Sequence, residues 1–178
     1  FQTDTTRIWK EMFDQGKLND IQSAFWKIKP PIEFYDTLKD PHEVNNLADS
    51  QPHASHRERL AAELHRWQIE IRDLGFLPEG EMHERRGKLT PYELGENNSK
   101  YPLAKIKNAA DFATAADQTS LPKLKEMMGH KDSAIRYWAA TGCIIVGKES
   151  KILKKDLLNL LKDTCPDVRT ASAHALFN

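Results

Sequence analysis

Few residues in this chain combine the types and the spacing that chemistry requires, and the best pair is histidine. His53 and His56 have an H-x-x-H spacing at a predicted helix start, which would place two metal ligands on one face. No third cysteine, histidine or carboxylate has a convincing role beside them, so we interpret the pair as a solvated helix start. His42 lies in the first turn of another predicted helix, where the dipole mildly disfavours a cation. We expect His42 to be exposed, with a place on the rim of a binding pocket in an intact, longer protein as the alternative.

The other chemically capable side chains also favour structural interpretations. Arg136 and Arg169 hold equivalent positions in an internal repeat, which predicts a ladder of hydrogen bonds or ion pairs and not an anion site. Cys143 and Cys165 are too few for a disulfide framework and have no CxxC partner, so cysteine usage does not fix the compartment. Four tryptophans lie on apolar helical faces, where core packing is expected and a carbohydrate platform is the alternative: Trp9, Trp26, Trp67 and Trp138. We therefore assign no catalytic, cofactor-binding or metal-binding residue.

The composition narrows the class of protein. The chain has 178 residues, enough for one ordinary domain or two small ones. Lys+Arg and Asp+Glu both number 26, so no excess positive charge favours nucleic acid as a partner. No apolar run approaches the roughly 18 residues that cross a bilayer. The first residues lack both a signal-peptide pattern and an initiator methionine, and we expect residue 1 to be a cut inside a longer protein.

Helical patterns dominate, with one interruption near residue 40. Ile32, Phe34 and Tyr35 indicate a short strand. Asp40-Pro41-His42-Glu43 then predicts a short helix ending near Ala48, because aspartate caps helices and proline suits the first position. Apolar residues recur at helical spacing in the predicted helices 3–15, 19–26, 53–74, 103–116, 121–128, 133–146, 152–162 and 167–176. Residues 78–100 are rich in glycine and proline, and we interpret them as a partly ordered linker with a helical turn at 90–94.

An internal repeat occupies the C-terminal part. Residues 124–143 align with 157–176 at an offset of 33, with an apolar helix, a polar turn and a second helix in each copy. The second helix opens with an aliphatic-arginine pair and continues with small residues, which let helices approach closely. The pattern resembles HEAT-like repeats, whose second helix often opens Pro-x-Val-Arg, as in Pro166-Asp167-Val168-Arg169. The first copy lacks that proline. We expect helix 103–116 to cap the stack, with helix 53–74 as a further candidate.

Residues 33–49, EFYDTLKDPHEVNNLAD, carry a second resemblance. The stretch resembles the C-terminal signature of the type I, formylglycine-dependent sulfatases, E-L-Y-D-L-x-x-D-P-x-E-x-x-N-L-A, with Phe34 in place of the leucine. The positions in step are Glu33, Tyr35, Asp36, Asp40, Pro41, Glu43, Asn46, Leu47 and Ala48. The flanks are similar to those of bacterial heparan N-sulfatase-like members, so the resemblance covers roughly residues 3–75.

The resemblance implies an enzyme whose chemistry lies elsewhere. Family members hydrolyse sulfate esters or sulfamates with a formylglycine made from a C/S-x-P-S-R motif and a calcium ion held by Asp and Asn side chains. This chain contains no such motif, since Cys165-Pro166-Asp167-Val168-Arg169 has its proline directly after the cysteine and lacks the serine. We expect formylglycine and calcium to belong to a missing N-terminal domain. The resemblance also implies a periplasmic or secreted parent.

Two hypotheses follow. In the first, the chain is a non-catalytic C-terminal fragment of a sulfatase-like hydrolase that acts on sulfated, glycosaminoglycan-type sugars. Its fold would be mainly α: a sulfatase-like segment with a short strand at 1–77, a linker at 78–100 and a HEAT-like module at 101–178. In the second, the chain is a helical-repeat protein-interaction module with no enzymatic role. The first predicts an exposed apolar patch along residues 3–48, and the second a patch on the concave face of the repeats. A homo-oligomer could cover either patch.

Overall fold

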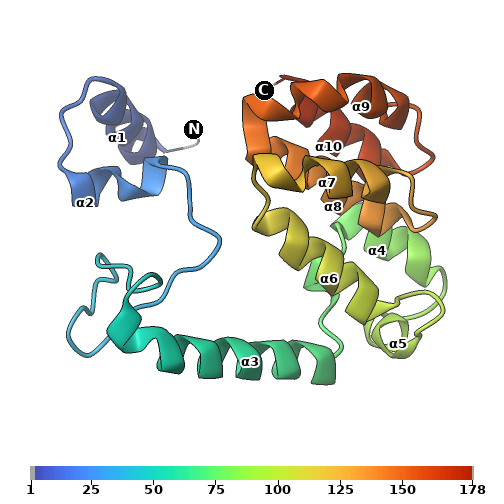
Figure 1. Ribbon diagram of the computed structural model, residues 1–178, viewed down its shortest axis with the longest axis horizontal. Helices are drawn as coiled ribbons and strands as arrows, with labels where there is room; N and C mark the ends of the chain where they lie inside the picture. The colour runs from blue at the N-terminus through green and yellow to red at the C-terminus, as the bar shows by residue number, and fades with distance from the viewer. Residues whose placement is uncertain (1–2, 178) are drawn as a thin grey trace. The chain divides into compact units, whose positions relative to one another are not determined.

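Helices make up the regular structure, as the sequence predicts. The computed structural model describes residues 3–177, and every regular element within that range is an α-helix or a 3-10 helix (Figure 1). The mainly α prediction is therefore confirmed. The contacts divide the chain into two compact units, Phe1–Ala61 and Ala62–Asn178, and each is described by itself. No helix in the described range is long and apolar enough to cross a membrane.

The first unit begins with two capped helices. The hydroxyl of Thr3 accepts a hydrogen bond from the backbone of Thr6 at the start of α1 (Asp4–Asp14). A capping box of Asn19 and Gln22 starts α2 (Asp20–Ser23), which continues as the 3-10 helix Ala24–Trp26. Both starts agree with the predicted ones. Side chains from the two helices then form an aromatic cluster, in which the ring of Trp9 lies 5.0 Å from Phe25 and 5.2 Å from Trp26.

This unit buries little of its apolar surface. Among its described residues only Ser23 and Ala48 are buried. Large apolar side chains remain exposed, including Ile21 at 62% and Phe25 at 58%. Burial of apolar area is the main force that offsets the entropy lost on folding. Residues 3–48 therefore expose the apolar surface that the sulfatase-fragment hypothesis predicts.

Residues 32–48 form an irregular loop, where we expected a strand followed by a helix. It contains neither the strand expected at Ile32–Tyr35 nor the helix expected from Asp40 to Ala48. A strand needs a neighbour to satisfy its backbone groups, and here the side chain of Asn46 does so instead, donating to the Ile32 carbonyl and accepting from the Phe34 amide. The Asp40 carboxylate accepts from the backbone of Asn45 and closes a turn, so it does not cap a helix.

Helix α3 (Ala54–Glu70) follows a 3-10 turn, Gln51–His53, and spans the boundary between the units. It ends before Arg72, whose φ of 56° is left-handed. The predicted apolar stripe lies along it, yet none of its residues is buried, and Trp67 is 52% exposed. The expected core role of Trp67 is therefore wrong in this chain.

Residues 78–100 form two helices where we expected a linker. α4 (Glu79–Arg86) and α5 (Pro91–Glu96) both belong to the second unit, and the capping box of Thr90 and Glu93 forms as predicted. The Arg72 side chain fastens the segment by donating to the carbonyl of Gly95 at 2.7 Å and to the side chain of Asn98 at 2.8 Å. The contacts divide the chain at Ala61–Ala62, whereas we expected a division near residue 77; Leu74, Phe76 and Leu77 pack with the core of the second unit.

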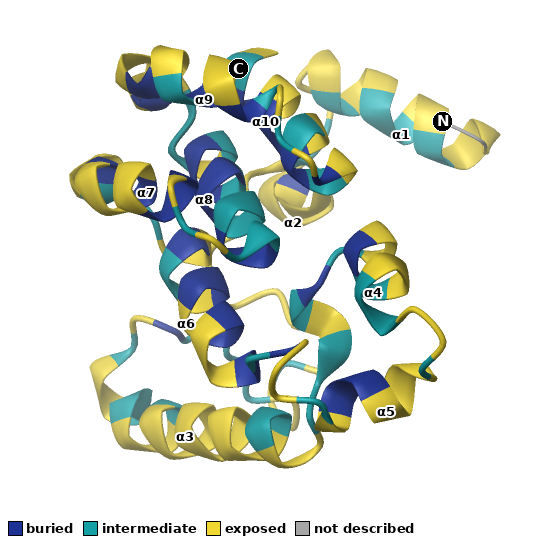
Figure 2. Ribbon diagram, turned by 90° about the vertical axis from the view of Figure 1, so that its right-hand side faces the viewer, coloured by how far each residue is buried: buried dark blue, intermediate teal, exposed yellow. Residues whose placement is uncertain are grey.

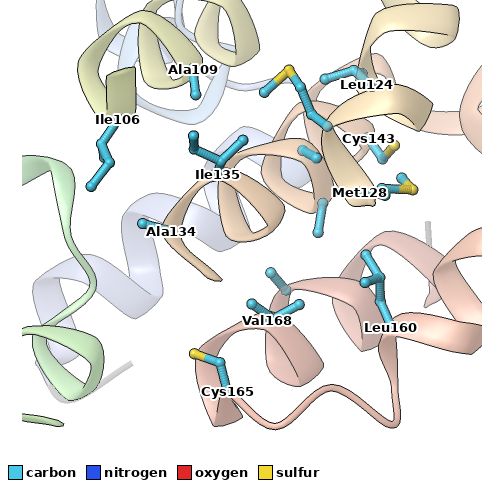
Figure 3. Packing of buried hydrophobic residues seen from close by; sticks show 14 of the residues in the cluster. Ile106, Ala109, Leu124, Met128, Ala134, Ile135, Cys143, Leu160, Cys165 and Val168 are labelled. Atoms are coloured by element: carbon cyan, nitrogen blue, oxygen red, sulfur yellow. The ribbon is translucent and has the colours of Figure 1, made fainter. Parts of the chain in front are cut away.

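The rest of the second unit is built around one central helix. Its helices are α6 (Leu103–Thr114), α7 (Leu121–Met128), α8 (Ser133–Val146), α9 (Lys154–Leu160) and α10 (Pro166–Phe177). A 3-10 segment, Gly147–Leu153, joins α8 to α9. α8 packs against α6, α7 and α10 (Figure 1), and the buried residues concentrate on these helices (Figure 2). α6 therefore covers the first hairpin, as expected. Figure 3 shows the core, where Ile135, Cys143 and Val168 lie among other buried apolar side chains.

The two hairpins, α7–α8 and α9–α10, repeat each other's polar contacts at the offset of 33. Arg136 donates to the carbonyls of His130 (2.8 Å) and Lys131 (3.0 Å). Arg169 donates to the carbonyls of the two equivalent residues, Asp163 (2.8 Å) and Thr164 (3.1 Å). The sequence repeat is thus also a repeat of local structure.

Gly142 on α8 provides a test of the core. A Cβ added there would lie 2.5 Å from Cδ2 of Leu124, a fully buried side chain of α7. We expect Gly142→Ala to lower the free energy of unfolding by about 2 kcal/mol, although alanine favours helices, because the crowded core must shift. Urea denaturation measures the change. Thr141→Ala, on the same helix, should change it by less than about 0.5 kcal/mol. Equal effects of the two substitutions would contradict the close approach of α7 and α8.

Candidate functional site

A buried polar junction links α4 to the two hairpins. Glu81 and Arg85 are four residues apart on α4 and therefore share a face. The Glu81 carboxylate accepts hydrogen bonds from Arg85 (2.6 Å), from the hydroxyl of Ser133 and from the thiol of Cys165 (2.7 Å). One carboxylate from α4 thus contacts the first turn of α8 and the residue just before α10.

Arg85 extends the junction to a helix cap. Its guanidinium pairs with the carboxylate of Asp132 and donates to the carbonyl of Lys100 at 3.0 Å. Asp132 is the N-cap of α8 and accepts from the backbone of Ala134 at 2.9 Å. The same carboxylate therefore starts α8 and holds α4 against it.

A second pair of the same kind joins the hairpins. Arg136 of α8 donates Nε and Nη2 to the two oxygens of Asp163, at 2.6 and 2.8 Å. Asp163 also accepts from the backbone of Cys165 at 2.9 Å, just before α10 begins. The structural role predicted for Arg136 is confirmed. Arg169, at the equivalent position, makes the carbonyl contacts but no carboxylate pair in the described part of the chain.

The electrostatics of the junction favour charged carboxylates and a neutral thiol. Burial alone would raise the pKa of Glu81, but its hydrogen bonds from Cys165, Ser133 and Arg85 outweigh burial and lower that pKa. Burial also opposes ionisation of Asp132, but the hydrogen bond and charge of Arg85 and the bond from the Ala134 backbone together outweigh burial, so the pKa of Asp132 is lowered too. Burial, with a smaller contribution from the hydrogen bond to Glu81, raises the pKa of the Cys165 thiol to about 11. Cys165 is therefore protonated at neutral pH and is not an activated nucleophile.

A hollow of about 370 Å³ lies beside the junction, lined by Arg85, Lys100, Lys131, Asp132 and neighbouring residues. Glu81, Cys165 and Asp167 bring three potential metal-ligand atoms within 4.8 Å of one another there. Both oxygens of Glu81 already accept hydrogen bonds, one of them from a guanidinium, and the thiol is protonated. The cluster does not fit calcium, which requires several free oxygen ligands. Its groups stabilise the fold.

Cys165-Pro166-Asp167-Val168-Arg169, the segment most like a sulfatase nucleophile motif, is a helix start. Pro166 is the first residue of α10, and Val168 lies fully buried in the core. The side chain of Arg169 folds back onto the preceding turn. This agrees with the position predicted from the repeat.

The remaining candidates lie apart from the junction in sequence and role. His53 is hydrogen-bonded through Nδ1 to the Ser50 hydroxyl at 2.8 Å, and His56 is exposed. Neither belongs to a group of three potential metal ligands within residues 3–177. His42 is exposed, as expected, and lines a hollow of about 770 Å³ with Tyr35 and Asn46 in the first unit.

Among the tryptophans, Trp138 contacts the core and donates to the Phe76 carbonyl at 2.9 Å. Trp9 and Trp26 belong to the aromatic cluster of the first unit.

Sequence reasoning missed Glu81 and Arg85. Their spacing on a helix was a usable signal, but the helix itself was taken for a linker because Met82 is its one large apolar residue. Their partners Asp132 and Cys165 are distant in sequence, and only the fold brings them together.

One comparison relates the chain to a known protein. Over 69 residues, 38% of the chain, the sequence is 38% identical to an ulvan-active sulfatase of Formosa agariphila. The match covers 12% of that sulfatase, so it spans a small part of the relative's length. No family model matches the sequence, and no solved structure matches the chain. The chain therefore contains a sulfatase-related region.

Removing the guanidinium of the junction should destabilise the second unit. Arg85→Met leaves the buried carboxylate of Glu81 and the half-buried carboxylate of Asp132 without their counter-charge, and we expect a loss of about 3 kcal/mol in the free energy of unfolding. Thermal and urea unfolding measure this loss. Arg86→Met is the matched control, because Arg86 contacts His83 and the Leu89 carbonyl but no carboxylate. A similar loss for both variants would contradict a specific role for Arg85.

The wild-type chain and the Arg85→Met variant should also differ in how their free energy of unfolding depends on pH. In the wild-type chain the folded-state pKa values of Glu81 and Asp132 lie below their ordinary values of 4.5 and 3.8. Their contribution to stability is then complete above about pH 4.5 and is lost as the pH falls through the folded-state values. In Arg85→Met both carboxylates lose the contribution of the guanidinium that lowers their pKa, so both pKa values lie higher than in the wild-type chain, and protonation at low pH removes the unpaired charge. We expect the stability gap between the two proteins to narrow from pH 7 to pH 4, and a constant gap would contradict this assignment.

Proposed function

We propose that this chain is the non-catalytic C-terminal part of a bacterial sulfatase-like hydrolase. The observation that carries the proposal is the identity with a sulfatase over 69 residues. The residues in step with the signature at 33–48 agree with it. The parent enzyme would hydrolyse sulfate esters or sulfamates on sulfated sugars of the glycosaminoglycan type, in the periplasm or outside the cell.

The surface of the first unit supports an anchoring role. Its exposed apolar side chains, with two buried residues in the described part of 1–61, suit a segment that folds against a larger surface. In this proposal that surface is the catalytic domain of the parent. Exposed apolar side chains thus lie within the range 3–48, which supports the anchoring role.

Formylglycine and calcium would belong to that catalytic domain. The sequence contains no C/S-x-P-S-R motif, and the cluster of Glu81, Cys165 and Asp167 does not suit a hard cation. The role of this chain is then to brace the catalytic domain or to line the rim of its pocket. The hairpins after residue 100 form a HEAT-like module within this proposal.

A second function, a helical-repeat interaction module, is favoured by a different observation. α10 carries exposed residues, including Phe177, which is 90% exposed. The two functions are compatible in one protein, since they use different surfaces.

Two measurements test the sulfatase proposal. The purified chain should not turn over an aryl sulfate, because it carries no nucleophile motif, while a complete sulfatase added to the same assay should show activity. Turnover by the chain alone would overturn its non-catalytic role. Sequencing the coding region upstream of Phe1 should reveal a C/S-x-P-S-R motif, and an open reading frame without one would overturn the assignment to the family.

A further inference from the structure

The internal repeat allows the exposure of each residue in the second hairpin to be compared with that of its counterpart in the first. Positions on α8 that face α10 have counterparts on α10 itself, 33 residues later. Ala140 is fully buried, while its counterpart Ala173 is exposed. Ile144 is half-buried, while its counterpart Phe177 is 90% exposed. The second hairpin thus exposes positions that are covered in the first.

The first helices of the two hairpins locate the corresponding side of α9, although Lys125 of α7 is itself exposed. Lys125 on α7 reaches Asp156 of the next hairpin at 3.7 Å, so its position faces that hairpin. Its counterpart on α9 is Leu158, an apolar residue that is 45% exposed. Met128 is buried, whereas its counterpart Leu161 is only half-buried. We call Leu158, Leu161, Arg169, Ala173 and Phe177 the outer face.

The free donors of Arg169 indicate that a group bound at the outer face should be negatively charged. Arg136 uses Nη1 for two turn carbonyls and keeps Nε and Nη2 for the carboxylate of Asp163. Arg169 uses Nη1 for the two equivalent carbonyls, and its Nε and Nη2 have no protein partner in residues 3–177. The guanidinium is therefore held in place with a two-pronged donor directed to a carboxylate.

The lysines along α9 also favour a negatively charged partner. Lys154 and Lys155 on α9, and Lys162 just after it, form no ion pair within the described chain. Asp156, the acid between them, already pairs with Lys125. A partner with acidic side chains around an apolar centre would complement both features.

We propose that the outer face docks a helical hairpin of another protein that carries a carboxylate in its interhelical turn. That carboxylate pairs with Arg169 as Asp163 pairs with Arg136, and apolar side chains cover Leu158, Ala173 and Phe177. A second copy of this chain does not offer the matching surface. The side of α8 that would have to be free in such a copy is covered by its own α6. This inference does not depend on the sulfatase proposal.

The test uses a hairpin of known sequence as the probe. An extended protein is made by adding a second copy of residues 146–178 directly after Asn178. Because this copy has 33 residues, it continues the period of the internal repeat. The appended copy carries Cys165→Ser. Ala173→Cys in the original chain places a thiol at the centre of the outer face. The native thiols give a low background, because both are buried and burial raises the pKa of Cys165 to about 11 and that of Cys143 to about 12.

We expect the introduced thiol to react with iodoacetamide at least about tenfold more slowly in the extended protein than in the unextended one. The midpoint of thermal unfolding should rise as well. In the extended protein, Asp163→Asn in the appended copy should restore much of the reactivity of the thiol when Arg169 is present. When the original chain carries Arg169→Gln, the same substitution should change the reactivity little, because the two side chains act as a pair in a double-mutant cycle.

Three results would overturn the proposal. The first is equal reactivity of the introduced thiol with and without the extension. The second is an effect of Asp163→Asn that does not depend on Arg169. The third is a concentration-dependent dimer of the unextended protein that protects the thiol by itself, because the face would then serve self-association. Sedimentation velocity of the unextended chain distinguishes this last case.

Discussion

The second unit depends on arginine side chains that bind a carboxylate at the start of the next helix. Arg85 binds Asp132 before α8, and Arg136 binds Asp163 before α10. Each carboxylate also accepts a backbone hydrogen bond at the start of its helix. A helix start is therefore fixed in place by the element that precedes it in the stack. Because an uncompensated buried charge is costly, these contacts select one register for the packing of α4, α8 and α10.

The first unit uses its polar residues differently. Asn46 bonds to backbone groups of Ile32, Phe34 and Ala48, and so completes a loop within a single segment. These contacts shape the loop but bury almost no apolar area. The loop is consequently ordered by local hydrogen bonds, while burial of apolar area contributes little to its stability within the described part of the first unit. This contrast is the physical basis for treating the first unit as an anchor and the second as a folded module.

Sequence reasoning succeeded where local patterns determine structure. The helix starts at Asn19 and Thr90 were predicted from short side chains that accept hydrogen bonds from the backbone, whereas the same argument failed at Asp40, where such a bond closes a turn. The hairpins followed from a repeat of small and apolar residues. Sequence reasoning failed at Ile32–Tyr35, because a strand exists only with a partner strand. It also failed at α4, because the contacts of this helix are polar and involve residues distant in sequence. The site was missed for the second reason, since nothing near Glu81 indicates that Ser133 and Cys165 will donate to it.

The positions of satisfied and unsatisfied polar groups limit where this chain can act on other molecules. Glu81, Arg85 and Asp163 are saturated by contacts inside the fold, so binding a ligand there would require breaking bonds that hold the helices together. Arg169 is different, because its side chain is fixed by two carbonyls and still has donors to offer. A fixed side chain loses little entropy when it binds. The repeat thus makes the same arginine a structural pair in one copy and a preorganised binding group in the next.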